Sequence, residues 1–283
     1  MDCKTGVAPL VVFVAVIALI LLFIVGLGVP TFEHLSVRVE GEDPAPEMPI
    51  YVINLRKRPD KKEKMEAELA RHGLRATFID AVDGRDLDLD ALKEERTVVD
   101  ALPRPLQGGL HKMWSRSLRR GEVGCYMSHL EAWHAILGTE SPYGLVLEDD
   151  VEFVPGFRRK LASLLGAGGG VGGEGERWDI LYLGRTCYHH SDFYHDDRCI
   201  TGDAVSDGIR QLIYPTVLGW GNFAYVIRRD TILKLLPHMY PIGRPIDHVL
   251  PELYERGEIK CAGLREDIAW VTSHTDSDTK RIH

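Results

Sequence analysis

Three consecutive carboxylates, Glu148, Asp149 and Asp150, are the residues of this sequence best suited to chemistry. They follow residues 145–147, a short apolar run that predicts a buried strand. Because side chains alternate in an extended chain, Glu148 and Asp150 are expected on one side and Asp149 on the other. Two carboxylates at a strand end offer the oxygen ligands that Mg²⁺ or Mn²⁺ prefers. The alternative interpretation is a solvated acidic turn that caps the next helix.

A divalent cation at these carboxylates would stabilise a diphosphate leaving group as its negative charge develops. The sequence therefore predicts a metal site with Asp150 and Glu148 as ligands. His274 lies beyond the last predicted strand, in the segment SHTDSDT, and is a candidate to complete that site. The alternative for His274 is an exposed histidine in a polar tail.

A second cluster, Gly121-Glu-Val-Gly-Cys-Tyr-Met-Ser-His129, precedes and enters a helix predicted over residues 126–137. A glycine-rich entry into a helix can present backbone N–H groups to an anion. Ser128 and His129 are therefore candidates to bind a phosphate or a sugar hydroxyl. The alternative is an N-capped helix whose histidine packs in the core.

Asp247 follows Pro245 at the start of another predicted helix. Its carboxylate could act as a general base that takes a proton from an acceptor hydroxyl. The alternative is an N-cap aspartate, which is common at that position. Asp149, pointing away from the predicted metal, is the second candidate for the base.

Apolar runs alternate with helical patterns along most of the chain, beginning with a strand, a helix and a strand between residues 50 and 82. That unit implies parallel strands, and the whole pattern predicts an α/β fold with a mixed, mostly parallel, Rossmann-like sheet and its site at the carboxyl ends of the strands. Further strands are expected at 178–184, 223–227 and 268–271, and helices at 231–236 and 245–254. Residues 85–120 are polar and expected to be irregular.

Residues 10–29 form an uncharged apolar stretch of the length needed to span a bilayer. We expect a short tail (1–9), a transmembrane anchor (10–29), a stem (30–49) and a catalytic domain (50–283) in a single-pass type II arrangement, with the domain in the lumen of the ER or Golgi. The alternative is a cleaved signal peptide, although no clear cleavage site follows.

The remaining features narrow the function classes. Formal net charge is −8 with dispersed Lys and Arg, which predicts no nucleic-acid partner. The glycine-rich stretch 166–175 lacks a phosphate-binding motif and is expected to be a surface insertion. Cys187 and Cys199 are the most plausible disulfide pair. The absence of a C-x-x-C pair argues against a structural zinc site.

Several segments together resemble glycosyltransferase family 25, which includes bacterial lipooligosaccharide galactosyltransferases and animal procollagen galactosyltransferases. They are VINL with Arg58, AVDG, GEVGCYMSHLEAW, LVLEDDVEF, WDILYLGR, GNFAYVIRRDTILKLLP and PIDHVLPELY. The similarity runs from about residue 50 to 279. The family often has an arginine where this chain has Lys61.

The resemblance implies a GT-A type fold, a UDP-sugar donor (usually UDP-galactose), Mn²⁺, and an inverting single displacement onto a hydroxyl of a protein or glycan acceptor. By matching position, it assigns the metal and diphosphate to Glu148 and Asp150, the acceptor base to Asp247, and a metal or phosphate ligand to His274. Residues matched to the nucleotide side are Asn54, Leu55, Arg58, Asp83 and Gly84. The alternatives are a non-catalytic adhesion or partner protein on a transferase fold, or a different nucleotide-sugar enzyme.

Overall fold

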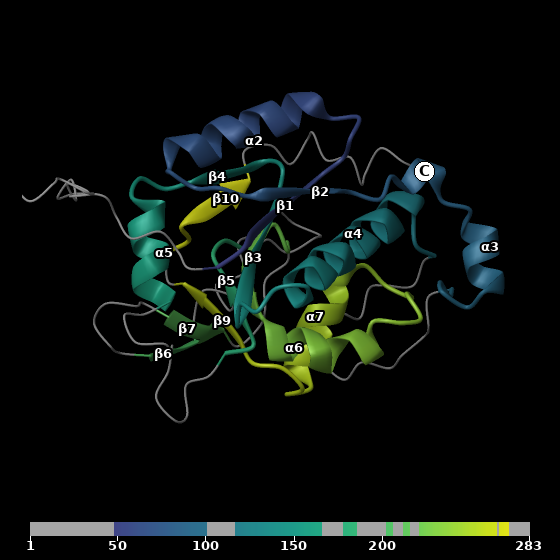
Figure 1. Cartoon of the computed structure of the whole chain (residues 1–283). Coiled ribbons are helices and arrows are strands. Elements are labelled where there is room, and N and C mark those ends of the chain that lie inside the picture. The colour runs from purple at the N-terminus through teal and green to yellow at the C-terminus, as the bar shows by residue number, and fades with distance from the viewer. Residues whose placement is uncertain are drawn as a thin grey trace, which may run out of the picture. The chain divides into compact units, whose positions relative to one another are not determined.

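The computed structural model describes residues 48–100, 117–165, 178–185, 202–205, 212–215, 221–264 and 266–271. They form an eight-stranded sheet of order β2-β1-β3-β8-β5-β9-β7-β6 and a two-stranded sheet of β10 and β4 (Figure 1). The strands are β1 (Ile50–Asn54), β2 (Thr77–Asp80), β3 (Tyr143–Glu148), β4 (Val151–Phe153), β5 (Ile180–Tyr182), β6 (Gly202–Val205), β7 (Leu212–Pro215), β8 (Ala224–Arg228), β9 (Cys261–Leu264) and β10 (Ala269–Val271). The helices are α2 (Pro59–Arg71), α3 (Leu89–Glu94), α4 (Arg120–Leu137), α5 (Phe157–Leu165), α6 (Arg229–Leu235) and α7 (Ile246–Glu255), with short 3-10 turns η1 (Gly84–Asp86) and η4 (Leu236–His238).

The predicted strand–helix–strand unit at the start of the domain is confirmed. β1 lies parallel to both β2 and β3, so the carboxyl ends of all three strands meet at one edge of the sheet. α2 begins with a proline at its first position and buries Met65 and Leu69, while most of its Lys and Glu side chains stay exposed. Gly73 follows at φ +62°, a conformation that glycine adopts without steric cost, and the helix has ended by then.

The sheet is mixed, as the sequence predicts. β8 lies antiparallel to both β3 and β5, β5 and β9 are parallel, and β7 lies antiparallel to β9 and β6. Six of the eight strands therefore run in one direction, and β8 and β7 run in the other. The reversal at β8 brings the start of that strand to the edge where β3 ends, since Ala224 pairs with Leu147.

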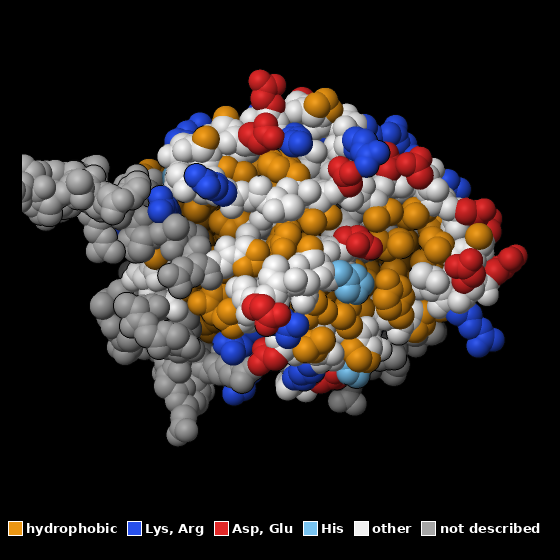
Figure 2. All heavy atoms as spheres, viewed as in Figure 1, with side chains coloured by type: hydrophobic (Ala, Val, Ile, Leu, Met, Phe, Trp, Pro, Cys, Tyr) orange, Lys and Arg blue, Asp and Glu red, His pale blue; other side chains and the backbone are white. Residues whose placement is uncertain are grey.

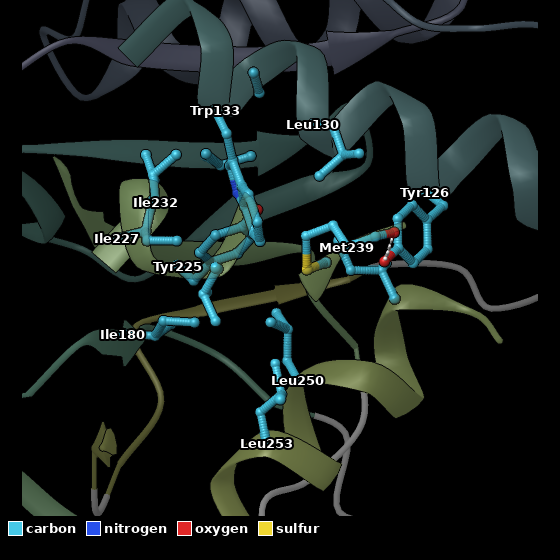
Figure 3. Close-up of a cluster of buried hydrophobic side chains, with 14 of the residues drawn as sticks. Tyr126, Leu130, Trp133, Ile180, Tyr225, Ile227, Ile232, Met239, Leu250 and Leu253 are labelled. Atoms are coloured by element: carbon cyan, nitrogen blue, oxygen red, sulfur yellow. Dashed lines mark hydrogen bonds between the residues drawn. The ribbon is translucent and has the colours of Figure 1, made fainter. Parts of the chain in front are cut away.

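Helices cover both faces of the sheet, because alternate residues of each strand point to opposite sides. Ile50 and Val52 of β1 pack in a core with α2 and α5, whereas Tyr51 and Ile53 pack in a second core with α4, α6 and α7. Figure 3 shows part of the second core, where Trp133 and Leu130 of α4 meet residues of β8, α6 and α7. Here the Tyr126 hydroxyl donates to the carbonyl oxygen of Met239 (2.8 Å).

Helix α4 starts at Arg120, six residues before the predicted start, so Gly121 and Gly124 lie inside the helix and the prediction of a glycine-rich entry loop was wrong. The reason is close packing. A Cβ on Gly124 would lie 2.5 Å from the carbonyl oxygen of Val82, and a Cβ on Gly84 would lie 2.4 Å from that of Arg120. These glycines let the first turns of α4 contact the turn after β2.

Replacing Gly124 with Ala is expected to destabilise the domain by about 1–3 kcal/mol, because the added methyl group overlaps backbone atoms that cannot rotate away. Thermal unfolding followed by circular dichroism measures this effect. Gly138→Ala, at the C-cap of the same helix in an ordinary helical conformation, is the matched control and should change stability little. Equal melting temperatures for the two variants would contradict the close contact.

Two further differences concern the ends of elements. Residues 85–100, expected to be irregular, include the end of η1 and helix α3, whose N-cap Asp88 accepts hydrogen bonds from two backbone N–H groups. The last strand, β10, is present but pairs with β4 outside the main sheet. Its preceding residue Ile268 donates to the carbonyl oxygen of Leu183 (2.8 Å), so the chain crosses the end of β5 before reaching β4.

The predicted membrane anchor at 10–29, the glycine-rich stretch at 166–175, and the residues Cys187, Cys199 and His274 lie outside the described residues. Within the described part of the chain, no helix is long and apolar enough to cross a bilayer.

Candidate functional site

The predicted site residues of the first three strands meet at one edge of the sheet. Asn54 ends β1, Asp83 and Gly84 follow β2, and Glu148 ends β3. Lys57, in the turn after β1, forms an ion pair with Asp83 (2.8 Å) and so joins the first two turns. The predicted clustering at the carboxyl ends of parallel strands is therefore confirmed.

Asp149 and Asp150 both form ion pairs with the buried side chain of Lys61. Lys61 of α2 places its Nζ atom 3.1 Å from Asp149 Oδ1 and 3.0 Å from Asp150 Oδ2. Asn54 donates a further hydrogen bond to Asp149 Oδ2 (2.7 Å). The expectation that Asp149 points away from Asp150 was wrong, because β3 ends at Glu148 and the chain turns there. Alternation applies only to extended backbone.

Glu148 faces helix α4 on the other side of this turn. Its Oε1 lies 3.6 Å from Nε2 of the buried His129. One turn earlier on α4, Cys125 brings its sulfur into the same group, and ligand atoms of the three residues all lie within 4.8 Å of one another. His129 is held from behind, since its Nδ1 lies 3.0 Å from the hydroxyl of Tyr225 on β8. Nδ1 of His129 is therefore packed in the core, as the alternative interpretation proposed. Nε2 faces Glu148 instead.

Asp247, the predicted base, lies in the first turn of α7, but it does not cap that helix. Its Oδ1 instead accepts hydrogen bonds from the backbone N–H (3.2 Å) and side-chain amide (2.9 Å) of Asn222. The hydroxyl of Tyr182 donates to the Asn222 side-chain oxygen (3.0 Å) and fixes the amide orientation. The carboxylate is therefore directed to the start of β8, towards the edge where β3 ends.

The pKa values of these groups depend on burial and on the charges of their neighbours. Burial, then the charge of Glu148, raises the pKa of Asp247 to about 6. Burial, then the charges of Asp150 and Asp149, raises the pKa of Glu148 to about 8. Burial lowers the pKa of His129 to about 4, so its imidazole is neutral at pH 7. Acids with raised pKa values are common at catalytic sites, where a proton must be held or moved near neutral pH.

Other predicted donor-site residues have structural partners. The Ser128 hydroxyl accepts from the backbone N–H of Val82 (2.8 Å) and donates to the carbonyl oxygen of Gly124 (2.6 Å). It holds α4 against the segment that follows β2, and this geometry does not support its predicted contact with the donor. Arg58 forms a fork with Asp60 (2.8 Å), in a turn closed by a hydrogen bond from the Arg58 N–H to the Leu55 carbonyl oxygen (2.7 Å).

Three residues of the site were missed from the sequence: Lys61, Asn222 and Cys125. Lys61 stands where the resembling family often has arginine, which was a signal for a cation facing the acidic triplet. Asn222 precedes a predicted strand, so its amide could have been placed near the strand edge. Cys125 was missed because the predicted helix began after it.

Figure 2 shows apolar side chains over much of the centre of one face, with acidic and basic side chains mostly around it and interspersed with one another.

Together, the described residues form an α/β domain with a cluster of acidic groups at the carboxyl ends of its strands. The sequence profile described as "Glycosyltransferase family 25 (LPS biosynthesis protein)" matches residues 47–250. The chain belongs to glycosyltransferase family 25.

Relatives differ in what their names say about activity. A Bos taurus protein named "Probable inactive glycosyltransferase 25 family member 3" is 32% identical over 211 residues, covering 73% of this chain and 32% of the relative. An Aedes aegypti glycosyltransferase 25 family member is 36% identical over 207 residues, covering 72% of this chain and 30% of the relative. Human procollagen galactosyltransferase 2 is 28% identical over 209 residues (73% and 30%). The chain spans about a third of the length of these relatives.

Among solved structures, a glycosyltransferase involved in the glycosylation of the major capsid of PBCV-1 matches with a TM-score of 0.39 at 10% identity, covering 84% of this chain and 96% of that one.

Proposed function

We propose that this chain is a metal-dependent inverting glycosyltransferase with a GT-A type fold, which transfers galactose from UDP-galactose to a hydroxyl of a protein or glycan. The observation that carries the proposal is the convergence of Asp247 with the Glu148–Asp150 triplet at one strand edge, where the pKa of Asp247 is raised to about 6. A carboxylate with that pKa is largely ionised at pH 7 and basic enough to accept a proton.

The carboxylates fit a hard divalent cation, Mn²⁺ or Mg²⁺. Asp150 uses Oδ2 for Lys61, while its buried Oδ1 has no hydrogen-bond partner among the described residues. Glu148 lies close enough to Asp150 for their charges to repel, and a bound cation would relieve this repulsion. When bound, the cation would stabilise the negative charge on the departing UDP. We propose Asp150 and Glu148 as ligands, with His274 as the third candidate.

Residues of the chain would bind the nucleotide and take the proton of the acceptor. Asn54, Leu55, Arg58, Asp83 and Gly84 line the turns after β1 and β2, where we place the nucleotide. Asp247 would take the proton of the acceptor hydroxyl as its oxygen bonds to the anomeric carbon and the bond from that carbon to the phosphate oxygen breaks. Asp149 is the weaker candidate, because Lys61 and Asn54 already engage both of its oxygens. Burial raises the pKa of Asp149, but Lys61 and Asn54 oppose this by stabilising the charged carboxylate.

Attachment to a membrane is a further part of the proposal. Residues 10–29 are uncharged and apolar over the length of a bilayer core. We propose a type II anchor that holds the domain in the lumen of the ER or Golgi, where glycosylated acceptors pass.

Calorimetric titration with UDP, with and without Mn²⁺, tests the donor site. We expect Mn²⁺-dependent binding by the wild type. Asp150→Ala should weaken Mn²⁺-dependent binding at least tenfold, because it removes one of two protein carboxylates from a small cation. Asp230→Ala, an exposed aspartate on α6, is the control and should bind like wild type. UDP binding that is unaffected by Mn²⁺ and by Asp150→Ala would contradict the assignment.

The rate of transfer should depend on pH through Asp247. Because only the ionised form accepts a proton, kcat is expected to fall as pH drops through about 6, the raised pKa of this group. Asn222 donates two hydrogen bonds to the ionised carboxylate, which lower its pKa. Asn222→Ala should therefore move the acid limb to higher pH, and Tyr182→Phe should move it less. An unchanged limb in Asn222→Ala would contradict this role for Asp247.

A second candidate function is supported by one observation: several relatives carry names that call them inactive. In that case the chain would serve as a membrane-bound partner or adhesion protein on a transferase fold. The two candidates differ in turnover of UDP-galactose.

A further inference from the structure

Helix α4 places a thiol and an imidazole on the same side, facing a carboxylate. Cys125 and His129 are four residues apart, so they lie one above the other on the helix. Glu148, at the end of β3, completes the group, and one ligand atom from each residue lies within 4.8 Å of the other two. This cluster, Cys125–His129–Glu148, differs from the Glu148–Asp150 set proposed for the donor cation, and only Glu148 belongs to both.

The imidazole of His129 points an unused nitrogen into this cluster. His129 is 1% exposed, and its Nε2 has no hydrogen-bond partner among the described residues. Its other nitrogen, Nδ1, lies 3.0 Å from the Tyr225 hydroxyl, which also accepts from Trp133 Nε1 (2.9 Å). Leaving a buried ring nitrogen without a hydrogen bond destabilises the folded chain unless another partner, such as a metal ion, binds it. Metal-bound histidines have this arrangement, with the second nitrogen hydrogen-bonded to a fixed partner.

The distances suit a small cation. Ligand bonds of about 2.0–2.3 Å around a tetrahedral ion place ligand atoms about 3.3–3.8 Å apart. His129 Nε2 and Glu148 Oε1 are already 3.6 Å apart. Cys125 is partly buried and has no disulfide partner among the described residues, and its sulfur lies within 4.8 Å of the other two ligand atoms.

We propose that Cys125, His129 and Glu148 form a binding site for a divalent cation of the Zn²⁺ type. One sulfur, one nitrogen and one oxygen ligand favour Zn²⁺ or Co²⁺ over Mn²⁺ and Mg²⁺, which prefer oxygen ligands alone. Three protein ligands leave a fourth position for water or substrate. The sequence lacks a C-x-x-C pair, and this argued against a structural zinc site. That argument does not apply to a site formed by one cysteine, one histidine and one glutamate.

A cation would displace the thiol proton, because cysteine binds metal as the thiolate. Binding should therefore tighten as pH rises.

Titration of the full chain with Co²⁺ under reducing conditions, without Mn²⁺ or nucleotide, tests the site. We expect a near-ultraviolet absorption band from charge transfer between thiolate and Co²⁺, and its loss when Zn²⁺ is added. Cys125→Ser should abolish the band and weaken Zn²⁺ binding by about 100-fold or more, because losing even a second-shell partner costs about 10- to 100-fold. Cys261→Ser, whose buried thiol lies outside the cluster, should retain both.

Glu148→Gln provides a second variant that keeps the thiol and the shape of the site. It should retain less than a tenth of the Zn²⁺ affinity, and circular dichroism checks that each variant is folded. A wild type without the band, or a Cys125→Ser variant that keeps it, would overturn the proposal. Since no donor is present, the result is independent of transferase activity, and a chain without turnover could still bind Zn²⁺ here.

Discussion

Replacing Asp247 with Asn is expected to lower kcat for transfer by about 10²- to 10⁴-fold, the usual contribution of a positioned general base. The amide has the same shape, and its oxygen can still accept the hydrogen bonds that Asn222 donates to Asp247 Oδ1. It lacks only the capacity to take a proton. Affinity for UDP should remain close to that of the wild type, because the proposed nucleotide residues lie in the turns after β1 and β2.

Steady-state kinetics with UDP-galactose and Mn²⁺ measure this effect, together with UDP titration of the same samples. Asp230→Asn is the matched control, since Asp230 lies in the first turn of the neighbouring helix α6 and is exposed. It should keep the wild-type rate. If Asp247→Asn keeps the wild-type kcat, the base is another group, and Asp149 becomes the next residue to change.

Replacing Lys61 with Met is expected to destabilise the domain by about 3–5 kcal/mol, because it leaves two carboxylates in a largely buried place without their cation. The side chains of Lys61, Asp149 and Asp150 are only 8%, 11% and 16% exposed. Burial lowers the pKa of Lys61, but the attraction of the two aspartates outweighs it and raises the pKa overall, so the amine is charged at pH 7.

Thermal or urea unfolding measures this loss, which corresponds to a decrease in Tm of roughly 10 °C for a domain of this size. Lys64→Met, on the exposed side of the same helix, is the control and should change stability by less than about 0.5 kcal/mol. Adding Asp150→Asn to Lys61→Met should recover part of the loss. Equal stability of the two lysine variants would mean that the ion pairs do not hold the triplet in place.

Much of this fold could be predicted from the sequence because its first elements carry strong local signals. The apolar run of β1 and the amphipathic pattern of α2 specify their elements without knowledge of distant contacts. The carboxyl ends of parallel strands must meet, so the grouping of Asn54, Asp83 and Glu148 followed from topology alone. Asp247 was a candidate from its place at the start of a predicted helix, and the family resemblance assigned that position the role of the base.

The parts that were missed depend on contacts between distant segments. Glycines in α4 weaken its local helical signal, and the helix starts early because Gly124 packs on the backbone of Val82. The orientation of Asp149 depends on the turn after β3 and on Lys61, which is 88 residues away in sequence. Local pattern does not encode either contact. The Cys125–His129 pair became visible only once the helix start was corrected.

The measurement that most directly tests the central claim is release of UDP from UDP-galactose in the presence of Mn²⁺, by the wild type and by Asp247→Asn at matched UDP occupancy. Hydrolysis to water is followed without acceptor, and transfer is followed with a panel of glycan and peptide acceptors. We predict Mn²⁺-dependent release by the wild type, at least about 100-fold faster than by the variant, and a β-linked product. The claim would be contradicted if the wild type binds UDP but its rate of UDP release from UDP-galactose is no higher than that of the variant. That result would favour a non-catalytic role.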